Sequence, residues 1–178
     1  MEHDKTFRGN ASQFFVAGEL CRRGYSAVVT LGNTPNVDVL CSNTAGTRFV
    51  HIQVKTFLPG NKTCSVGTKA QRDFGPSFFW ILAGIPSPET DHHFQYYIIP
   101  SKDMAHNVSH AHNLWLKTPG SKGQPHKDSN VRIVHLPPHK SSGEWDISQY
   151  LNRWDLIEEK MKDEQSDGAH ERTSAVYP

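Results

Sequence analysis

The sequence lacks any hydrophobic run that is long enough to cross a membrane. No stretch approaches the roughly 18 consecutive apolar residues of a transmembrane helix, and the opening Met-Glu-His-Asp-Lys does not have the order of a signal peptide. Cysteine is scarce, because the chain has only three, widely spaced, with no CxxC pair. These features exclude a membrane-spanning protein and a secreted disulfide scaffold. We therefore expect a cytoplasmic protein with buried or half-buried thiols.

Several catalytic signatures are also missing. The chain has no P-loop, no GxGxxG, no GxSxG and no HExxH. This excludes the usual phosphate loop of NTPases, the dinucleotide-binding fingerprint, the nucleophile elbow and the helical zinc-protease site. Five of the 11 histidines could suggest zinc, but they have no cysteine partner nearby, so we interpret them as surface residues: His92, His93, His106, His110 and His112.

The net charge is close to zero, since 19 Lys and Arg and 18 Asp and Glu give a total of +1. The charges are unevenly distributed along the chain. Residues 1–75 contain nine basic and five acidic side chains, whereas residues 155–178 contain seven acidic and three basic ones. Because a basic body is averaged with an acidic end, the small total does not exclude a nucleic-acid partner.

The length of 178 residues fits one globular domain with a real hydrophobic core. Beyond Asp163 the composition becomes acidic and polar, which predicts a disordered tail. We therefore expect a single domain over residues 1–162 and an acidic tail over residues 163–178.

Periodicity and turn residues predict an α/β fold. Asn10 to Gln13 resembles a capping box for a helix that ends at Gly24. Gly18 inside this helix suggests that another backbone or a ligand approaches there. The further elements expected are strands at 25–31, 36–41, 48–57, 77–83, 94–99 and 131–136, a loop at 58–76, and helices at 101–116 and 144–162.

Polar side chains fall on two neighbouring strands of this fold. Gln53 and Lys55 face the same way, because side chains alternate along a strand. Asp38 reaches Gln53 if its strand forms a hairpin with 48–57, since paired strands lie about 4.8 Å apart. Carboxylate, amide and backbone carbonyl oxygens are ligands that suit Mg²⁺, and the Val54 carbonyl is a further ligand of this kind.

Such a set suits the divalent-metal hydrolysis of a phosphodiester. Lys55 beside a metal-bound water favours hydroxide and counters the charge that develops at phosphorus. Glu19, on the first predicted helix, binds the metal through water or orients the nucleophile. Each residue has an ordinary alternative: Glu19 pairs with Arg22 or Arg23, Asp38 bonds its own backbone, and Lys55 is a surface lysine. The joint placement on adjacent elements favours the site.

At these residues the sequence resembles the PD-(D/E)XK nuclease superfamily. The matching stretches are Gly18-Glu19, Pro35-Asn36-Val37-Asp38 and Ile52-Gln53-Val54-Lys55-Thr56. The resemblance implies an α/β fold with a restriction-endonuclease-like mixed central sheet flanked by helices, DNA as substrate, and Mg²⁺ or Mn²⁺ as cofactor. By this likeness the helix acid is Glu19, the two metal-binding positions are Asp38 and Gln53, and the lysine is Lys55.

Two features depart from the family pattern. Pro35 is separated from Asp38 by two residues, and Gln53 replaces the usual acid, which is similar to some intron-encoded homing endonucleases. A neutral Gln removes one negative charge, so we expect the metal affinity to fall.

The loop after Lys55 contains Lys62, Lys69 and Arg72, which either contact backbone phosphates or are ordinary solvated charges. Two functions are open. One is a metal-dependent DNA endonuclease, possible as a homodimer because each subunit would cut one strand. The alternative is a catalytically weak or inactive nucleic-acid-binding or protein-interaction module on the same fold.

Overall fold

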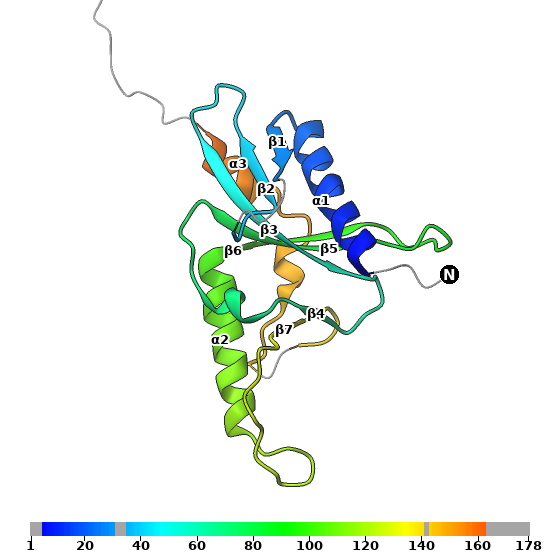
Figure 1. Ribbon diagram of the computed structural model, residues 1–178, viewed down its shortest axis with the longest axis vertical. Helices are drawn as coiled ribbons and strands as arrows, with labels where there is room; N and C mark the ends of the chain where they lie inside the picture. The colour runs from blue at the N-terminus through cyan, green and yellow to red at the C-terminus, as the bar shows by residue number, and fades with distance from the viewer. Residues whose placement is uncertain (1–4, 31–34, 141–142, 163–178) are drawn as a thin grey trace, which may run out of the picture.

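A computed structural model describes residues 5–30, 35–140 and 143–162 of the chain (Figure 1). The acidic tail expected over residues 163–178 lies outside this part. Among the described helices, none has the length and apolarity needed to cross a membrane. The elements are α1 (Lys5–Arg22), β1 (Ser26–Val29), β2 (Val39–Ser42), β3 (Phe49–Phe57), β4 (Thr63–Ser65), η1 (Thr68–Gln71), β5 (Phe78–Gly84), β6 (Gln95–Pro100), α2 (Ser101–Lys117), β7 (Ile133–His135), η2 (Ile147–Tyr150) and α3 (Asp155–Met161).

The central sheet has five strands in the order β1-β2-β3-β5-β6. The strands β1, β2 and β3 form an antiparallel meander, in which Val39 lies opposite Ile52. Strand β5 lies parallel to β3, with Gln53 opposite Trp80, and β6 returns antiparallel to β5. The predicted hairpin and the mixed central sheet are therefore confirmed.

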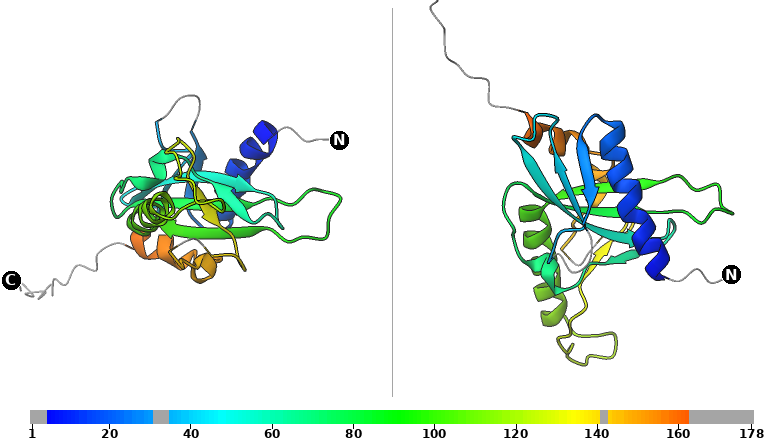
Figure 2. Two further views of the ribbon diagram at one scale, coloured as in Figure 1. Left: turned by 90° about the horizontal axis from the view of Figure 1, so that it is seen from below. Right: turned by 45° about the horizontal axis from the view of Figure 1, so that its top comes forward.

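The sheet separates two hydrophobic cores, because successive side chains of each strand point to opposite faces. On the first face, α1 and α3 pack against alternate residues of β3 that include Ile52. On the second face, α2, η2 and the small β4-β7 sheet pack against residues of β5 that include Trp80. The right view of Figure 2 shows the strands between α1 and α2. This second hydrophobic core contains residues of β3, β5 and β6 but none of β1 or β2.

Helix α1 begins earlier than the sequence predicts. Asn10 lies inside the helix rather than at its N-cap, because the helix already includes Lys5. Ser12, two residues after Asn10, has a different role from the one expected in a capping box. Its hydroxyl donates to the Gly9 carbonyl one turn back, at 2.7 Å.

The C-terminal end of α1 is the predicted one. Gly24 has a φ of 91°, which L side chains rarely adopt. Its N–H donates to the Cys21 carbonyl at 2.9 Å, and the Tyr25 N–H donates to the Leu20 carbonyl at 3.2 Å. These two bonds form a Schellman motif, which satisfies the last carbonyls of the helix.

The outer side of α1 differs from two expectations. A side-chain carbon added at Gly18 would meet no protein atom within 4 Å, so the expected approach of another backbone is wrong, and the approach of a ligand stays a prediction. Cys21 is exposed, whereas Cys41 and Cys64 are buried. The buried residues of α1 form one stripe along the helix. They are Ser12, Val16 and Leu20, spaced four apart, together with Ala17.

The segment 144–162 is not one continuous helix, as the sequence predicts, but η2 followed by α3. Between them, Leu151 bridges to Tyr97 of β6, and the Asn152 N–H donates to the Tyr96 carbonyl at 2.7 Å. The chain passes along the free edge of β6 and changes faces, so Tyr150 joins the second core and Trp154 the first. The aromatic residues of this segment therefore pack into two hydrophobic cores rather than one.

The segment 58–76, predicted as a loop, contains the short strand β4. Its partner is β7, with Cys64 opposite Val134. A pairing across such a long sequence separation leaves no local periodic signal in three residues.

Candidate active site

Asp38 lies at the point where the pairing of β2 with β3 ends. Its N–H donates to the Ile52 carbonyl at 2.8 Å, which continues the ladder by one residue. Its carboxylate then takes the place of the next backbone acceptor of β2, because Oδ2 accepts the Val54 N–H at 2.7 Å. The same oxygen accepts a hydrogen bond from Nε2 of Gln53. The half-buried Asp38 therefore joins the backbone and a side chain of β3 in one contact.

The backbone of β3 directs a further oxygen to this point. The His51 N–H donates toward β5, to the Ser77 carbonyl, whereas the Ile52 carbonyl accepts from Asp38 on the β2 side. Because these directions alternate along a strand, the Val54 carbonyl points to the same side as its N–H, toward Asp38. The structure thus brings together Asp38, Gln53 and Val54, as the sequence predicts.

Lys55 shares the strand face of Gln53, one pleat further along. The side chain of Gln53 is 8% exposed, and Lys55 is half-buried. Burial raises the pKa of the Cys64 thiol to about 12, and the positive charge of Lys55 opposes this shift. The positive charge of Lys55 therefore lies within electrostatic reach of Cys64 in β4.

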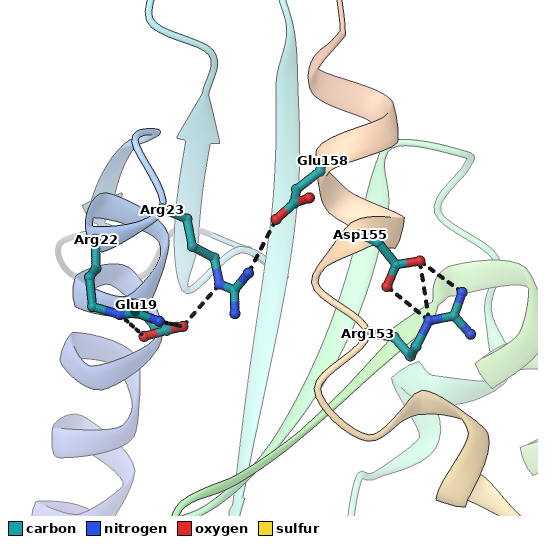
Figure 3. A network of polar contacts seen from close by, with 6 residues as sticks. All are labelled: Glu19, Arg22, Arg23, Arg153, Asp155 and Glu158. Atoms are coloured by element: carbon teal, nitrogen blue, oxygen red, sulfur yellow. Dashed lines mark hydrogen bonds and ion pairs between the residues drawn. The ribbon is translucent and has the colours of Figure 1, made fainter.

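Glu19 occupies a different place. Its carboxylate accepts hydrogen bonds from Arg22 at 2.8 Å and from Arg23 at 2.9 Å, and Arg23 extends the contact to Glu158 of α3 at 3.2 Å (Figure 3). The hydrogen bond from Arg22 is the largest cause that lowers the pKa of Glu19. This geometry gives the catalytic assignment of Glu19 no support. Instead, the pairing with Arg22 and Arg23 that the sequence allows is present, and it links two helices.

Another residue of α1 contacts the strand of Gln53 and Lys55. Ser12 is fully buried, and its Oγ lies 2.6 Å from Oγ1 of Thr56 on β3. Since the Ser12 hydroxyl proton is given to the Gly9 carbonyl, Thr56 is the donor of this contact. The bond anchors the helix beside the end of β3. The sequence carries no signal for this pair, because 44 positions separate the two residues.

The three basic residues of the following loop are all exposed. Lys62 lies between β3 and β4, and Lys69 lies in η1. The guanidinium of Arg72 lies over the ring of Phe74, 5.1 Å from its centroid. Of these three side chains, Arg72 is therefore the one held in position by a contact with a ring.

Metal-binding capacity is limited by the number of acids. In residues 5–30, 35–140 and 143–162, no three His, Cys, Asp or Glu side chains gather into a group that would hold a metal ion. The oxygens beside Asp38 are instead an amide and a backbone carbonyl. They are hard ligands of the type that Mg²⁺ prefers, with a single negative charge among them. The donor set therefore fits a divalent cation in kind, with reduced electrostatic attraction.

A cavity of about 220 Å³ lies elsewhere, between α2 and β7. Its lining includes Trp115, Arg132 and His135, and none of the residues around Asp38 contributes to it. This cavity is therefore separate from the candidate site.

Comparison with solved structures finds nuclease folds. A bacterial homing endonuclease, I-Ssp6803I, is 16% identical with a TM-score of 0.52, and the match covers 88% of this chain and 94% of that chain. Archaeoglobus fulgidus Hjc, a Holliday junction resolvase from an archaeal hyperthermophile, is 13% identical with a TM-score of 0.41, over 71% of this chain and 83% of that chain. No protein-family model matches the chain, and comparison with curated proteins finds no relative. The likeness to the homing endonuclease confirms the expected restriction-endonuclease-like fold.

Proposed function

We propose that this protein is a divalent-metal-dependent DNA endonuclease. The observation that carries the proposal is the convergence of the Asp38 carboxylate with Gln53 and Val54 on β3. Lys55 follows two residues later on the same strand face, which supports placing one ammonium group near these oxygen ligands. The fold shared with a homing endonuclease supports the same reaction class.

The residues divide the work by their chemistry. Asp38, the Gln53 amide oxygen and the Val54 carbonyl would hold Mg²⁺ or Mn²⁺, which would supply an activated water and neutralise phosphate charge. Lys55 donates to the nonbridging phosphate oxygen and stabilises the charge that develops at phosphorus. The amide of Gln53 must rotate to offer its oxygen, because its nitrogen now donates to Asp38.

Incubation of the purified chain with single-stranded, duplex and branched DNA tests the proposal. We expect cleavage with Mg²⁺ or Mn²⁺ and none with EDTA. Asp38→Asn and Lys55→Ala are each expected to lower the rate by roughly 100-fold or more, because each removes a group that stabilises the transition state. Lys102→Ala, on the exposed start of α2, is the matched control for Lys55→Ala. Metal-dependent cleavage that survives both substitutions would overturn the assignment.

A second function is favoured by one observation. Gln53 donates directly to the Asp38 carboxylate, a contact that a catalytically inactive nucleic-acid-binding or protein-interaction module would also make. Gln53→Glu discriminates between the two, since it places two carboxylates together and restores the usual acid. For a metal site, Mg²⁺ should raise the melting temperature of Gln53→Glu more than that of the wild type. If neither form cleaves DNA but both bind it with steep salt dependence, the binding module is correct.

Subunit number and phosphate contacts complete the proposal. Lys62, Lys69 and Arg72 are proposed to contact the DNA backbone, and their substitution by Gln should reduce the salt dependence of binding. The homodimer stays a prediction, which light scattering of the purified chain with and without DNA would check.

A further inference from the structure

Half of the second sheet face has no cover from the described residues. Helix α2 packs over β5 and β6, and β4 contacts β3, whereas the side chains of β1 and β2 on this face are exposed or half-exposed. Strand register places them in one surface, since Val28 pairs with Leu40 and Leu40 with His51. We call this surface the open face. Its residues are Ser26, Val28, Leu40, Ser42, Phe49 and His51.

The open face leads directly into the candidate active site. Phe49 and His51 precede Gln53 and Lys55 at intervals of two along β3, so all four side chains stand on one face, about 6.6 Å apart in succession. Phe49 is 46% exposed, and His51 is exposed, although both lie within a regular strand. Two planar rings therefore line the approach to the site.

A positive charge borders the open face. Phe78 lies opposite His51 in the parallel register, Phe74 stacks on Phe78 with ring centroids 4.6 Å apart, and Arg72 lies over Phe74. This series of contacts connects the guanidinium of Arg72 to the strand neighbour of His51, on the β5 side of the open face. The neighbouring carboxylate of Asp73 is turned to its own backbone, where it accepts the Gly75 N–H at 2.9 Å.

The charge pattern favours an anionic occupant. The six residues of the open face include no acid. The acids of Glu19 and Glu158 lie on α1 and α3, which cover the opposite face. Asp38 is the exception at the end of the surface, where the proposed metal would offset its charge. The charges alone would admit any anionic chain, and the exposed rings of Phe49 and His51 favour the bases of a nucleic-acid strand over an acidic protein segment.

We propose that the open face binds an unpaired DNA strand and delivers it to the site at Asp38 and Lys55. Bases stack on Phe49 and His51, and Arg72 contacts a phosphate. An intact duplex does not suit these rings, because its bases are already stacked on one another and cannot present a face to a side chain. The inference rests on the proposed nuclease function and narrows its substrate to DNA with a single-stranded segment.

Binding measurements in EDTA test this inference without any cleavage. The probes are a fluorescent oligothymidylate and a fluorescent duplex of equal length, followed by anisotropy. Phe49→Ala and His51→Ala should each weaken oligothymidylate binding by roughly 5- to 150-fold and change duplex binding by less than about twofold. Phe49→Tyr, which keeps the ring, should bind as the wild type does. The matched control is Phe14→Ala, an exposed phenylalanine on the outer side of α1.

Salt dependence separates stacking from charge. Arg72→Gln should reduce the slope of log affinity against log salt by about 0.7 on the single strand, whereas Phe49→Ala should leave this slope unchanged. Circular dichroism shows whether each variant is folded before it is compared.

The outcomes distinguish this inference from the proposed function. If Phe49→Ala and His51→Ala bind oligothymidylate as the wild type does, or lose single-stranded and duplex binding equally, the inference is wrong. When Asp38-dependent cleavage persists in that case, the nuclease function stands alone. If no form binds or cuts any DNA, the nuclease function fails and the inference fails with it.

Discussion

At the scale of single residues, Asp38 and Gln53 show how a functional pair is tolerated within a sheet. The register of β2 with β3 ends at the pair Val39 and Ile52, which would leave the Val54 N–H without a strand partner. The Asp38 carboxylate accepts that N–H and so stabilises the end of the ladder. The residue proposed to bind metal thus has a structural role as well, which is why Asp38→Asn, whose amide oxygen still accepts the bond, is the preferred variant.

Glycine positions provide a direct test of the packing. A side-chain carbon added at Gly84 would lie 2.6 and 2.7 Å from two ring carbons of Phe57, so Gly84→Ala should lower the free energy of unfolding by about 1–3 kcal/mol. Gly18→Ala meets no atom within 4 Å and should raise it by about 0.5–1 kcal/mol, because Ala is favoured in a helix. Urea unfolding of both variants measures the difference. An equal effect of the two substitutions would contradict the packing described.

At the scale of elements, α1 and α3 are joined through Arg23 (Figure 3). Its guanidinium bonds Glu19 and Glu158 and lies over the ring of Trp154, 5.1 Å from the centroid. Arg153 and Asp155, in contrast, pair locally beside α3, with both side chains about half exposed. The first group connects two helices that are far apart in the sequence, and the second does not.

Arg23→Met should therefore lower the free energy of unfolding by about 1–2 kcal/mol, because it removes two ion pairs and a cation–π contact but keeps the alkyl chain. Arg153→Met is the matched control and should change it by less than about 0.5 kcal/mol. Chemical denaturation of the two variants measures both values. Similar losses would show that the contact between helices contributes nothing beyond a surface pair.

The same contact makes stability depend on pH. The hydrogen bond from Arg22, together with that from Arg23, lowers the pKa of Glu19 below its ordinary value of 4.5. The folded state then binds fewer protons than the unfolded state, so this stabilisation is present above pH 4.5 and is lost as the pH falls through the lowered pKa. The stability difference between the wild type and Glu19→Gln should be largest near neutrality and should shrink in acid. A difference that grows toward acid would contradict this sign.

At the scale of the whole molecule, burial divides the three thiols into two classes. Cys21 is exposed, whereas Cys41 and Cys64 are buried, and burial raises the pKa of each of these two to about 12. Because the thiolate is the reactive form, a disulfide reagent at neutral pH should modify one thiol quickly in the native protein. The other two should react only after denaturant is added. Three fast thiols would contradict the packing of both cores.

Charge is also a property of the whole chain. Residues 163–178 contain four acids and one arginine, beside a body with an excess of basic residues. If this acidic tail competes with DNA for the basic surface, a chain that ends at Lys162 should bind DNA more tightly at low salt. The gain should vanish as salt is added, because screening removes the competition. Unchanged affinity at low salt would refute this role.

The sequence by itself determined the main strands and the pairing that unites Asp38 with Gln53. Alternation along β3 and the turn after Ser42 are local properties, so residue types alone indicate them. The same holds for Gly24, whose left-handed conformation ends α1. The resemblance to PD-(D/E)XK nucleases rested on these segments and on residues close together in the sequence.

Only the tertiary structure decided where each face of an element is covered. It paired Glu19 with Arg23, which reaches Glu158 of α3, interrupted the segment before α3 at the edge of β6, and paired Ser12 with Thr56. It also left Phe49 exposed beside the candidate site. These features depend on contacts between residues far apart in the chain. Periodicity reports that a side chain is apolar or polar, but it does not report which neighbour will meet it.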